Sequence, residues 1–219
     1  MATMPPEYDK TKSMEHHKKP EDYFIPAYDT KGRFISYWYQ INEILGREPR
    51  RVLEVGVGNK FVSGYLDSRG VEVVTVDIDE RLEPDVTAPV TVIPFADASF
   101  DVVFCCQVLE HLPYENFRPA LQELRRVASG IVLISLPDSR SYMKFTLQFS
   151  DWAATHRLLS HPRLKGRELS DAGEHHWEIG RRGYPLKRIK GDIRAAGLNT
   201  VRTHRIFENP YHHFFILER

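Results

Sequence analysis

Arg51-Val-Leu-Glu-Val-Gly-Val-Gly58 is an apolar run that enters a glycine-rich turn, and Val73-Val-Thr-Val-Asp-Ile-Asp79 is a second apolar run that ends in acids. Gly56 and Gly58 carry no Cβ, so the backbone can turn sharply and approach a ligand closely. Asp77 follows Gly56 by about 20 residues, the spacing at which an acid after the second strand holds ribose hydroxyls. This layout predicts an α/β fold with a nucleotide-type cofactor site on a parallel sheet.

The turn differs from a dinucleotide-binding fingerprint. It reads Glu54-Val-Gly-Val-Gly-Asn-Lys60, without the third glycine that lets pyrophosphate sit at the helix N-terminus. The Glu54 carboxylate would repel a pyrophosphate, but it could help to anchor a cationic aminoacyl group. The turn therefore disfavours NAD without excluding an NAD-binding protein.

Two further segments follow in order along the chain. They are Ile93-Pro-Phe-Ala-Asp-Ala-Ser-Phe-Asp-Val-Val-Phe104 and Val108-Leu-Glu-His-Leu-Pro113. With the glycine-rich turn, they make the chain resemble a class I S-adenosylmethionine-dependent methyltransferase of the type 11-like group, over roughly residues 33–219. The resemblance implies S-adenosylmethionine as the cofactor.

The resemblance also implies the fold: a three-layer α/β/α Rossmann-like arrangement with a mostly parallel seven-stranded sheet and an antiparallel C-terminal strand. Apolar runs and helical spacing of apolar residues agree with it. We expect strands at 51–55, 72–77, 101–106, 130–136, 199–207 and 212–217, and helices at 34–45, 61–69, 113–129 and 186–196. The stretch 79–91 is short and proline-broken where the family has a helix and a third strand, and Pro89 and Val90 stand in place of the family's adenine-side acid and small residue.

The chain divides into an N-terminal arm at 1–30 and a methyltransferase domain at 31–219. The arm is polar and proline-rich, and we expect it to have little regular structure. Residues 139–183 interrupt the repeat with aromatic and basic side chains. This insertion follows a central strand at the sheet edge where α/β proteins bind ligands, so it is expected to cap the active site on the substrate side.

The resemblance assigns the cofactor contacts by position. The glycines would pass under the aminoacyl and ribose parts, the first acid would orient the loop or meet the ammonium, and the second would accept the ribose hydroxyls. Asp97 would either face adenine or cap a turn. The expected cofactor-binding residues are Glu54, Gly56, Gly58, Asp77, Ile78, Asp97, Cys106 and Gln107.

Methyl transfer by in-line SN2 displacement depends mainly on alignment of the reactants. A base, if one is used, would be a histidine, whose ordinary pKa suits proton removal near neutrality. The candidates are His111, which either faces the cofactor region or ties a loop, and the pair His175 and His176. No metal site is expected, because no cysteine or spaced histidine completes a ligand set around that pair.

Composition limits the class of protein. The 219 residues suit one globular domain, and the 30 basic residues balance the 30 acidic ones, so no overall field attracts nucleic acid. We expect no membrane-spanning segment and no signal peptide, and hence a cytoplasmic protein. The sequence does not indicate an oligomeric state.

The predicted function is methyl transfer to an oxygen or nitrogen atom of a small metabolite, with an anionic metabolite as the finer hypothesis. An RNA methyltransferase is an alternative, because residues 157–194 contain ten Lys or Arg against five Asp or Glu. A third alternative is a non-catalytic or NAD-binding protein on the same fold, since Lys60 replaces the last glycine of the family's turn.

Overall fold

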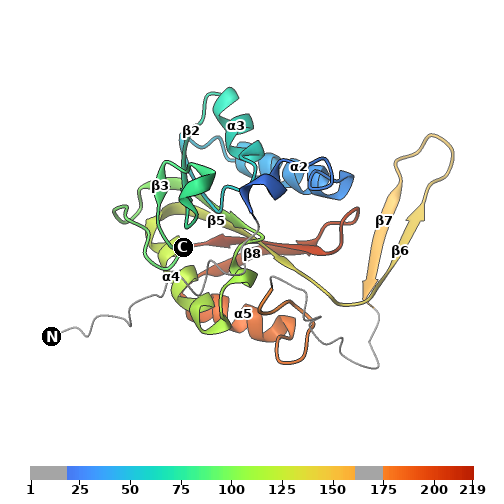
Figure 1. Ribbon diagram of the computed structural model, residues 1–219. Helices are drawn as coiled ribbons and strands as arrows, with labels where there is room; N and C mark the ends of the chain where they lie inside the picture. The colour runs from blue at the N-terminus through green and yellow to red at the C-terminus, as the bar shows by residue number, and fades with distance from the viewer. Residues whose placement is uncertain (1–18, 161–174) are drawn as a thin grey trace.

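The computed structural model describes residues 19–160 and 175–219. A seven-stranded sheet with the order β3-β2-β1-β4-β5-β9-β8 forms its centre (Figure 1). The strands are β1 (Arg51–Val55), β2 (Glu72–Asp77), β3 (Val86–Thr87), β4 (Phe100–Cys106), β5 (Ala128–Pro137), β8 (Asn199–Arg205) and β9 (His212–Glu218).

Strand β1 pairs in parallel with β2 and with β4, and β4 pairs in parallel with β5. Strand β9 is antiparallel to both β5 and β8, between which it lies. The uninterrupted apolar runs of β4 and β5 are buried because helices cover both faces of the sheet. The predicted fold class is confirmed, including an antiparallel C-terminal strand in the described seven-stranded sheet.

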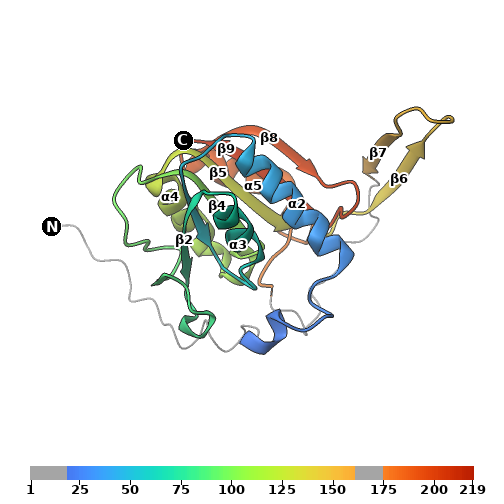
Figure 2. The same cartoon turned by 90° about the horizontal axis from the view of Figure 1, so that it is seen from above.

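Helices α2 (Lys31–Leu45) and α3 (Phe61–Ser68) cover one face, and α4 (Phe117–Val127) and α5 (Leu186–Ala195) cover the other (Figure 1). Figure 2 shows α2 lying across the strands. Two separate apolar clusters result, one on each face. Ile44, Leu66 and Phe104 belong to the first, and Leu121 and Ile189 belong to the second.

The order of the strands places the ligand site. From β1 the chain proceeds outward to β2 and β3, and then returns to β4 on the other side of β1. Such a reversal opens a crevice beyond the carboxyl ends of the strands, where open α/β sheets bind ligands. The turns after β1, β2 and β4 therefore converge, although they are far apart in the sequence.

Several elements differ from the sequence-based expectation. Strand β3 has only two residues, and Pro89 follows it closely. The helix expected at 113–129 begins later, because Pro113 precedes a 3-10 turn, η4 (Tyr114–Asn116), and α4 ends at Val127. The other short 3-10 helices are η1 (Pro20–Tyr23), η2 (Glu80–Leu82) and η3 (Leu109–His111). Residues 1–18 of the predicted arm lie outside the described residues.

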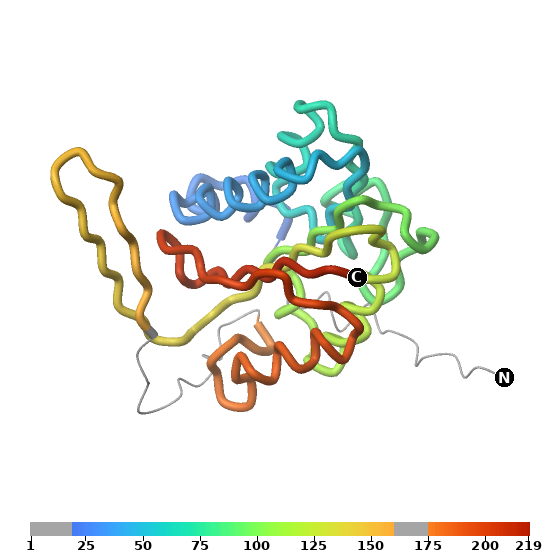
Figure 3. The backbone as a smooth tube through the Cα atoms, turned by 180° about the vertical axis from the view of Figure 1, so that it is seen from behind, coloured from blue at the N-terminus to red at the C-terminus, as the bar shows by residue number. Residues whose placement is uncertain are grey.

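The described part of the 139–183 insertion contains a hairpin, β6 (Tyr142–Leu147) and β7 (Thr155–Ser160), that forms its own two-stranded sheet. It projects away from the body (Figure 3). Its base contacts the turn between β8 and β9, where Lys144 Nζ donates to the carbonyl oxygen of Glu208 over 3.0 Å. Residues 161–174 lie outside the described residues.

Candidate active site

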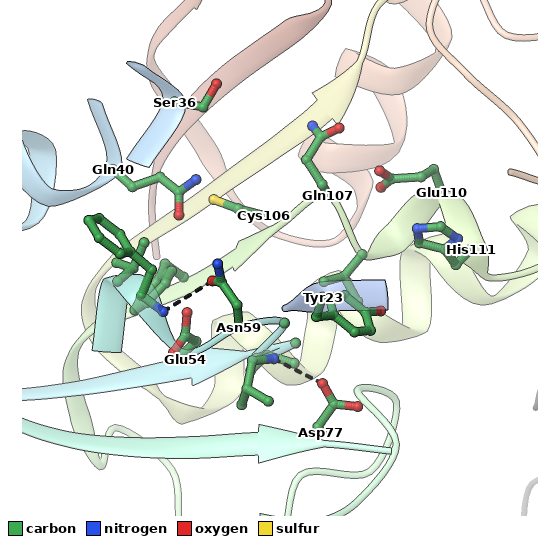
Figure 4. Close-up of a pocket in the computed structure, with 18 of the residues that line it drawn as sticks. Tyr23, Ser36, Gln40, Glu54, Asn59, Asp77, Cys106, Gln107, Glu110 and His111 are labelled. Carbon is green, nitrogen blue, oxygen red and sulfur yellow. Dashed lines mark hydrogen bonds between the residues drawn. The ribbon is translucent and has the colours of Figure 1, made fainter. Parts of the chain in front are cut away.

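A cavity of about 450 Å³ lies beyond the carboxyl ends of β1, β2 and β4 (Figure 4). Because the turns after these strands meet there, most of the site residues predicted from the sequence line this cavity. Those lining it are Glu54, Gly56, Gly58, Asp77, Ile78, Cys106, Gln107, His111 and His175.

The glycine-rich turn needs glycine at its first position for two reasons. Gly56 has a φ of +87°, a left-handed conformation that side chains disfavour, and a Cβ there would lie 2.2 Å from Cγ2 of Val108. Gly58 also has a positive φ, +49°. Lys60, in the place of the family's last glycine, adopts a left-handed φ of 59° just before α3. Lysine here therefore preserves the backbone conformation that a glycine would give.

Asp77 organises the cavity wall. Its Oδ2 accepts a hydrogen bond of 2.9 Å from the backbone N–H of Val57, and its Oδ1 accepts one of 2.9 Å from that of Asp79. A carboxylate has about four acceptor positions, so these bonds leave capacity for further donors. Asp77 thus fixes the glycine-rich turn and still lines the cavity.

Glu54 is a buried acid at the end of β1, with 5% of its surface exposed. Its Oε2 has no hydrogen-bond partner among the residues that the structure describes. Burial raises its pKa to about 8, against the opposing effect of a hydrogen bond with Ser63. A buried acceptor without a partner inside a cavity suits a ligand that brings a positively charged donor.

The opposite wall is mainly apolar. Ile78 and Leu82 line it together with the segment after β3, Ala88, Pro89 and Val90. The adenine-side acid expected of the family is absent from that segment. Asp79, which is buried and paired with Arg81 at 2.7 Å, lines the cavity from the end of β2 instead.

The end of β4 is held by β5. The backbone N–H of Gln107 donates to the carbonyl oxygen of Ser135, and its side-chain amide donates to the Ser135 hydroxyl over 3.2 Å. Gln107 has a positive φ of 58°. Burial raises the pKa of the Cys106 thiol to about 12, so the thiol stays protonated near neutrality and is a poor nucleophile.

Two predicted site residues do not line the cavity. The Asp97 side chain is 66% exposed and forms an ion pair with Arg126 at 3.0 Å on the surface. His176 is exposed, and its backbone N–H donates to the carbonyl oxygen of Glu110 over 2.9 Å. Its neighbour His175 lines the cavity.

His175 and His111 lie together at the β4 end of the cavity, with ring centroids 4.9 Å apart. The Nδ1 atom of His175 lies 3.0 Å from Oε1 of Glu178. Glu178 also accepts hydrogen bonds from Tyr211 and Arg181, over 2.8 and 2.9 Å. Although burial opposes ionisation, these donors hold the pKa of Glu178 well below its usual range.

Glu110 is a site residue that the sequence analysis missed. Its side chain is fully buried at the cavity wall, and within 19–160 and 175–219 neither carboxylate oxygen has a hydrogen-bond partner. Burial raises its pKa to about 7. Figure 4 shows its carboxylate and the His111 ring on the same side of the pocket. The sequence feature that could have indicated Glu110 is the Glu-His pair at the end of η3.

The arm contributes residues that its polar composition concealed. Tyr23 and Tyr28 line the cavity next to Gly58, with their rings 5.1 Å apart in an edge-on contact. Tyr37 of α2 also lines it, and its hydroxyl donates to Oδ1 of Asn59 over 3.3 Å. The tyrosines within this polar segment were the sequence feature that could have indicated a contact with the cavity.

The described insertion residues and basic residues mostly lie elsewhere. From the described parts of 139–183, His175 lines the cavity and the β6–β7 hairpin does not, so this hairpin does not cap the site. Among the basic residues of 157–194 that the structure describes, none lines the cavity. The arrangement that an RNA methyltransferase would need is not observed for them.

Comparison with known proteins agrees with the geometry. The family model described as a methyltransferase domain matches residues 53–134, which contain the turn, Asp77 and the end of β4. A "Probable S-adenosylmethionine-dependent methyltransferase" of Mycobacterium tuberculosis is 29% identical over 121 residues, 47% of this chain and 43% of that protein. Over this region the chain is similar to class I S-adenosylmethionine-dependent methyltransferases. The predicted family and its cofactor are thereby confirmed.

Two further similarities extend this assignment. An uncharacterised protein of Methanocaldococcus jannaschii is 30% identical over 118 residues, 50% of each chain. The match thus spans about half the length of these sequence relatives. The Burkholderia thailandensis 1,6-didemethyltoxoflavin-N1-methyltransferase structure aligns with a TM-score of 0.62 and 17% identity, over 100% of this chain and 91% of that one. This last likeness shows the fold of the methyltransferase family.

Membrane insertion through a helix is not supported by the described residues. None of the helices in 19–160 and 175–219 combines the length and apolar character needed to cross a bilayer.

Proposed function

We propose that the chain transfers a methyl group from S-adenosylmethionine to an oxygen or nitrogen atom of a small molecule. One observation carries the proposal: a single cavity is lined by the glycine-rich turn and Asp77 as well as by His111 and His175. Cofactor and acceptor would therefore meet in one enclosed space. S-adenosylmethionine, when bound, supplies an electrophilic methyl group on a cationic sulfur.

The residues of the cavity fit this cofactor. Asp77 retains acceptor capacity for ribose hydroxyls, and Glu54 offers a buried oxygen without a partner to the aminoacyl ammonium. Ile78, Leu82 and Val90 provide an apolar wall of the kind that packs against adenine. In this proposal Gly56, Gly58, Cys106 and Gln107 bind through their backbone.

His111 and His175 would act on the acceptor. An imidazole near neutrality can remove a proton from an attacking hydroxyl or amine. Glu178, which lies on the Nδ1 side of His175, orients that ring toward the cavity. Asp97 and His176 have no part in this proposal, since they lie outside the cavity.

The acceptor is proposed to be a small molecule, and an anionic one is favoured by Arg33. This residue is the single Lys or Arg among the described cavity-lining residues, and its guanidinium stacks 3.8 Å above the Tyr28 ring centroid. The solved methyltransferase from Burkholderia thailandensis holds a small molecule, 1,6-didemethyltoxoflavin, beside S-adenosylhomocysteine. Residues 31–219 would form the catalytic domain, with His175 as the insertion's contribution.

Calorimetric titration of the whole chain with S-adenosylmethionine, S-adenosylhomocysteine and NAD tests the cofactor. We expect binding of the first two in the micromolar range and no binding of NAD. Binding of NAD alone, or of none of the three, would overturn the proposed function.

A further inference from the structure

Three potential metal ligands meet at the His111 end of the cavity. Glu110, His111 and His175 each offer one ligand atom, and these atoms all lie within 4.8 Å of one another. Ligands around a tetrahedral zinc ion are separated by about 3.4 Å, given bond lengths near 2.1 Å. Side-chain rotations that bring each atom roughly 1 Å inward would therefore form a ligand set.

The fold alone does not explain why the carboxyl group of Glu110 is buried. Its carboxyl is fully buried, yet both oxygens lack hydrogen-bond partners in the described part of the chain. A buried carboxyl without partners is costly, and buried charges in proteins are normally paired or bound to metal ions. Nε2 of His175 lies 4.0 Å from Oε1 of Glu110, which is too far for a hydrogen bond.

His175 is oriented as metal-binding histidines usually are. Its Nδ1 atom faces the Glu178 carboxylate at 3.0 Å, and its Nε2 atom is turned toward Glu110. A carboxylate on one ring nitrogen fixes the tautomer in which the other nitrogen carries a lone pair. Glu178 is itself held by Tyr211 and Arg181, so this orientation is built into the fold.

We propose that Glu110, His111 and His175 bind a divalent transition-metal ion such as Zn²⁺, with at least one coordination position open to the cavity. Two imidazoles and one carboxylate are a ligand set that catalytic zinc sites use, and imidazole favours zinc-like ions over Mg²⁺ or Ca²⁺. The sequence analysis expected no such site, because Glu110 was not considered and His111 and His175 are far apart in the chain.

A metal ion at this site would also take part in the reaction, and this role rests on the proposed function. A metal ion held by Glu110, His111 and His175 would bind an oxygen atom of the acceptor and would lower the pKa of its hydroxyl group. The acceptor atom would then be a hydroxyl oxygen rather than a nitrogen, and His111 and His175 would hold the ion instead of acting as bases. Metal binding itself does not depend on methyl transfer, so the two can fail separately.

The test uses the full chain, stripped with a chelator and then titrated with Zn²⁺ by calorimetry and with Co²⁺ by visible absorption. We expect one ion per chain and the intense Co²⁺ bands of a low-coordinate site. His111→Ala, His175→Ala and Glu110→Gln should each weaken binding at least tenfold. Glu178→Gln, which alters only a supporting contact, should weaken it about 10–100-fold and shift the Co²⁺ spectrum.

His176→Ala is the matched control, because this adjacent histidine is exposed and lies outside the cluster. It should leave Zn²⁺ affinity unchanged. Circular dichroism and S-adenosylhomocysteine titration of each variant separate a lost ligand from a lost fold. The proposal is overturned if the wild-type chain binds no ion, or if binding survives in the His111→Ala/His175→Ala double variant. Ion binding without S-adenosylhomocysteine binding would retain the metal site and reject the proposed function.

Discussion

The Oδ2 atom of Asp77 lies 2.9 Å from the backbone nitrogen of Val57, so the acid at the end of β2 holds the turn that follows β1. The same carboxylate lines the cavity. Asp77 therefore has two functions, since it fixes the shape of the glycine-rich turn and presents acceptors to a ligand. A substitution here should affect both the turn and the ligand.

Asp77→Ala should weaken S-adenosylhomocysteine binding by about 1–3 kcal/mol, the range for lost hydrogen bonds that involve a charged group. Calorimetric titration measures the change. Asp97→Ala is the control, because Asp97 is an exposed acid outside the cavity. Equal losses in the two variants would contradict the assignment of Asp77 to the ligand.

Glu54→Gln should reduce proton release when the ligand binds. Burial raises the pKa of Glu54 to about 8, so the free protein holds this carboxyl mostly protonated at pH 7. The ammonium of S-adenosylhomocysteine favours the ionised form, and binding therefore releases a proton. Calorimetry at pH 7 in buffers of different ionisation enthalpy measures it. Equal release by wild type and Glu54→Gln would show that Glu54 does not meet the ammonium.

The same residue should affect stability in the absence of ligand. Because the folded pKa of Glu54 is raised, its contribution is fully present below about pH 4.5 and is lost as pH rises through about 8. Glu54→Gln should flatten the decline of the unfolding free energy over this window. Urea denaturation at pH 5 and pH 8.5 measures the slope, and parallel slopes in the two proteins would refute the prediction.

Gly56→Ala should damage the protein more than Gly70→Ala. Both glycines have a left-handed φ, +87° and +81°, so alanine costs about 1–2 kcal/mol at either place. A Cβ at Gly70 meets nothing within 4 Å, whereas one at Gly56 meets Val108 at 2.2 Å. We expect an additional loss of about 1–3 kcal/mol at Gly56, together with loss of ligand binding. Similar melting temperatures for the two variants would argue against this close approach.

Asp138→Asn should destabilise the junction of β5 and β9. Burial of Asp138 opposes ionisation, but hydrogen bonds from His213 and Arg140 outweigh it and lower the pKa to about 2. This stabilisation is present above about pH 4 and is lost as pH falls through about 2, so it contributes roughly 2 kcal/mol at pH 7. The gap in unfolding free energy between wild type and variant should shrink as pH falls from 4 to 2. A gap that stays constant would contradict the assignment.

The sheet could be predicted from the sequence because each strand is marked by the residues of its own short segment. Continuous apolar runs such as β5 mark buried strands, and the spacing between Gly56 and Asp77 reflects one strand-turn-helix-strand unit. The start of α4 was less accurately predicted, because the 3-10 turn after Pro113 has no strong sequence signal.

The positions of several predicted site residues depend on tertiary packing. His175 and His176 are equivalent as sequence, and their opposite directions are set by Glu178 and Glu110, which contact the segment. Asp97 matches the family motif but is paired with Arg126 of α4, which keeps it on the surface. Glu110 has no spacing that marks it, since its burial arises from the way η3 packs under the 175–179 segment.

Strand β8 hydrogen-bonds only to β9 within the described sheet, and β9 lies between it and β5. During synthesis, β5 is made well before His212–Glu218, whereas β8 precedes that segment by only six residues. Neither facing edge can be completed until this segment emerges, although β1, β2, β4 and β5 can already pair. The sheet is therefore completed in a fixed order: β1, β2, β4 and β5 can pair first, and β8 joins them only after β9 has paired with β5.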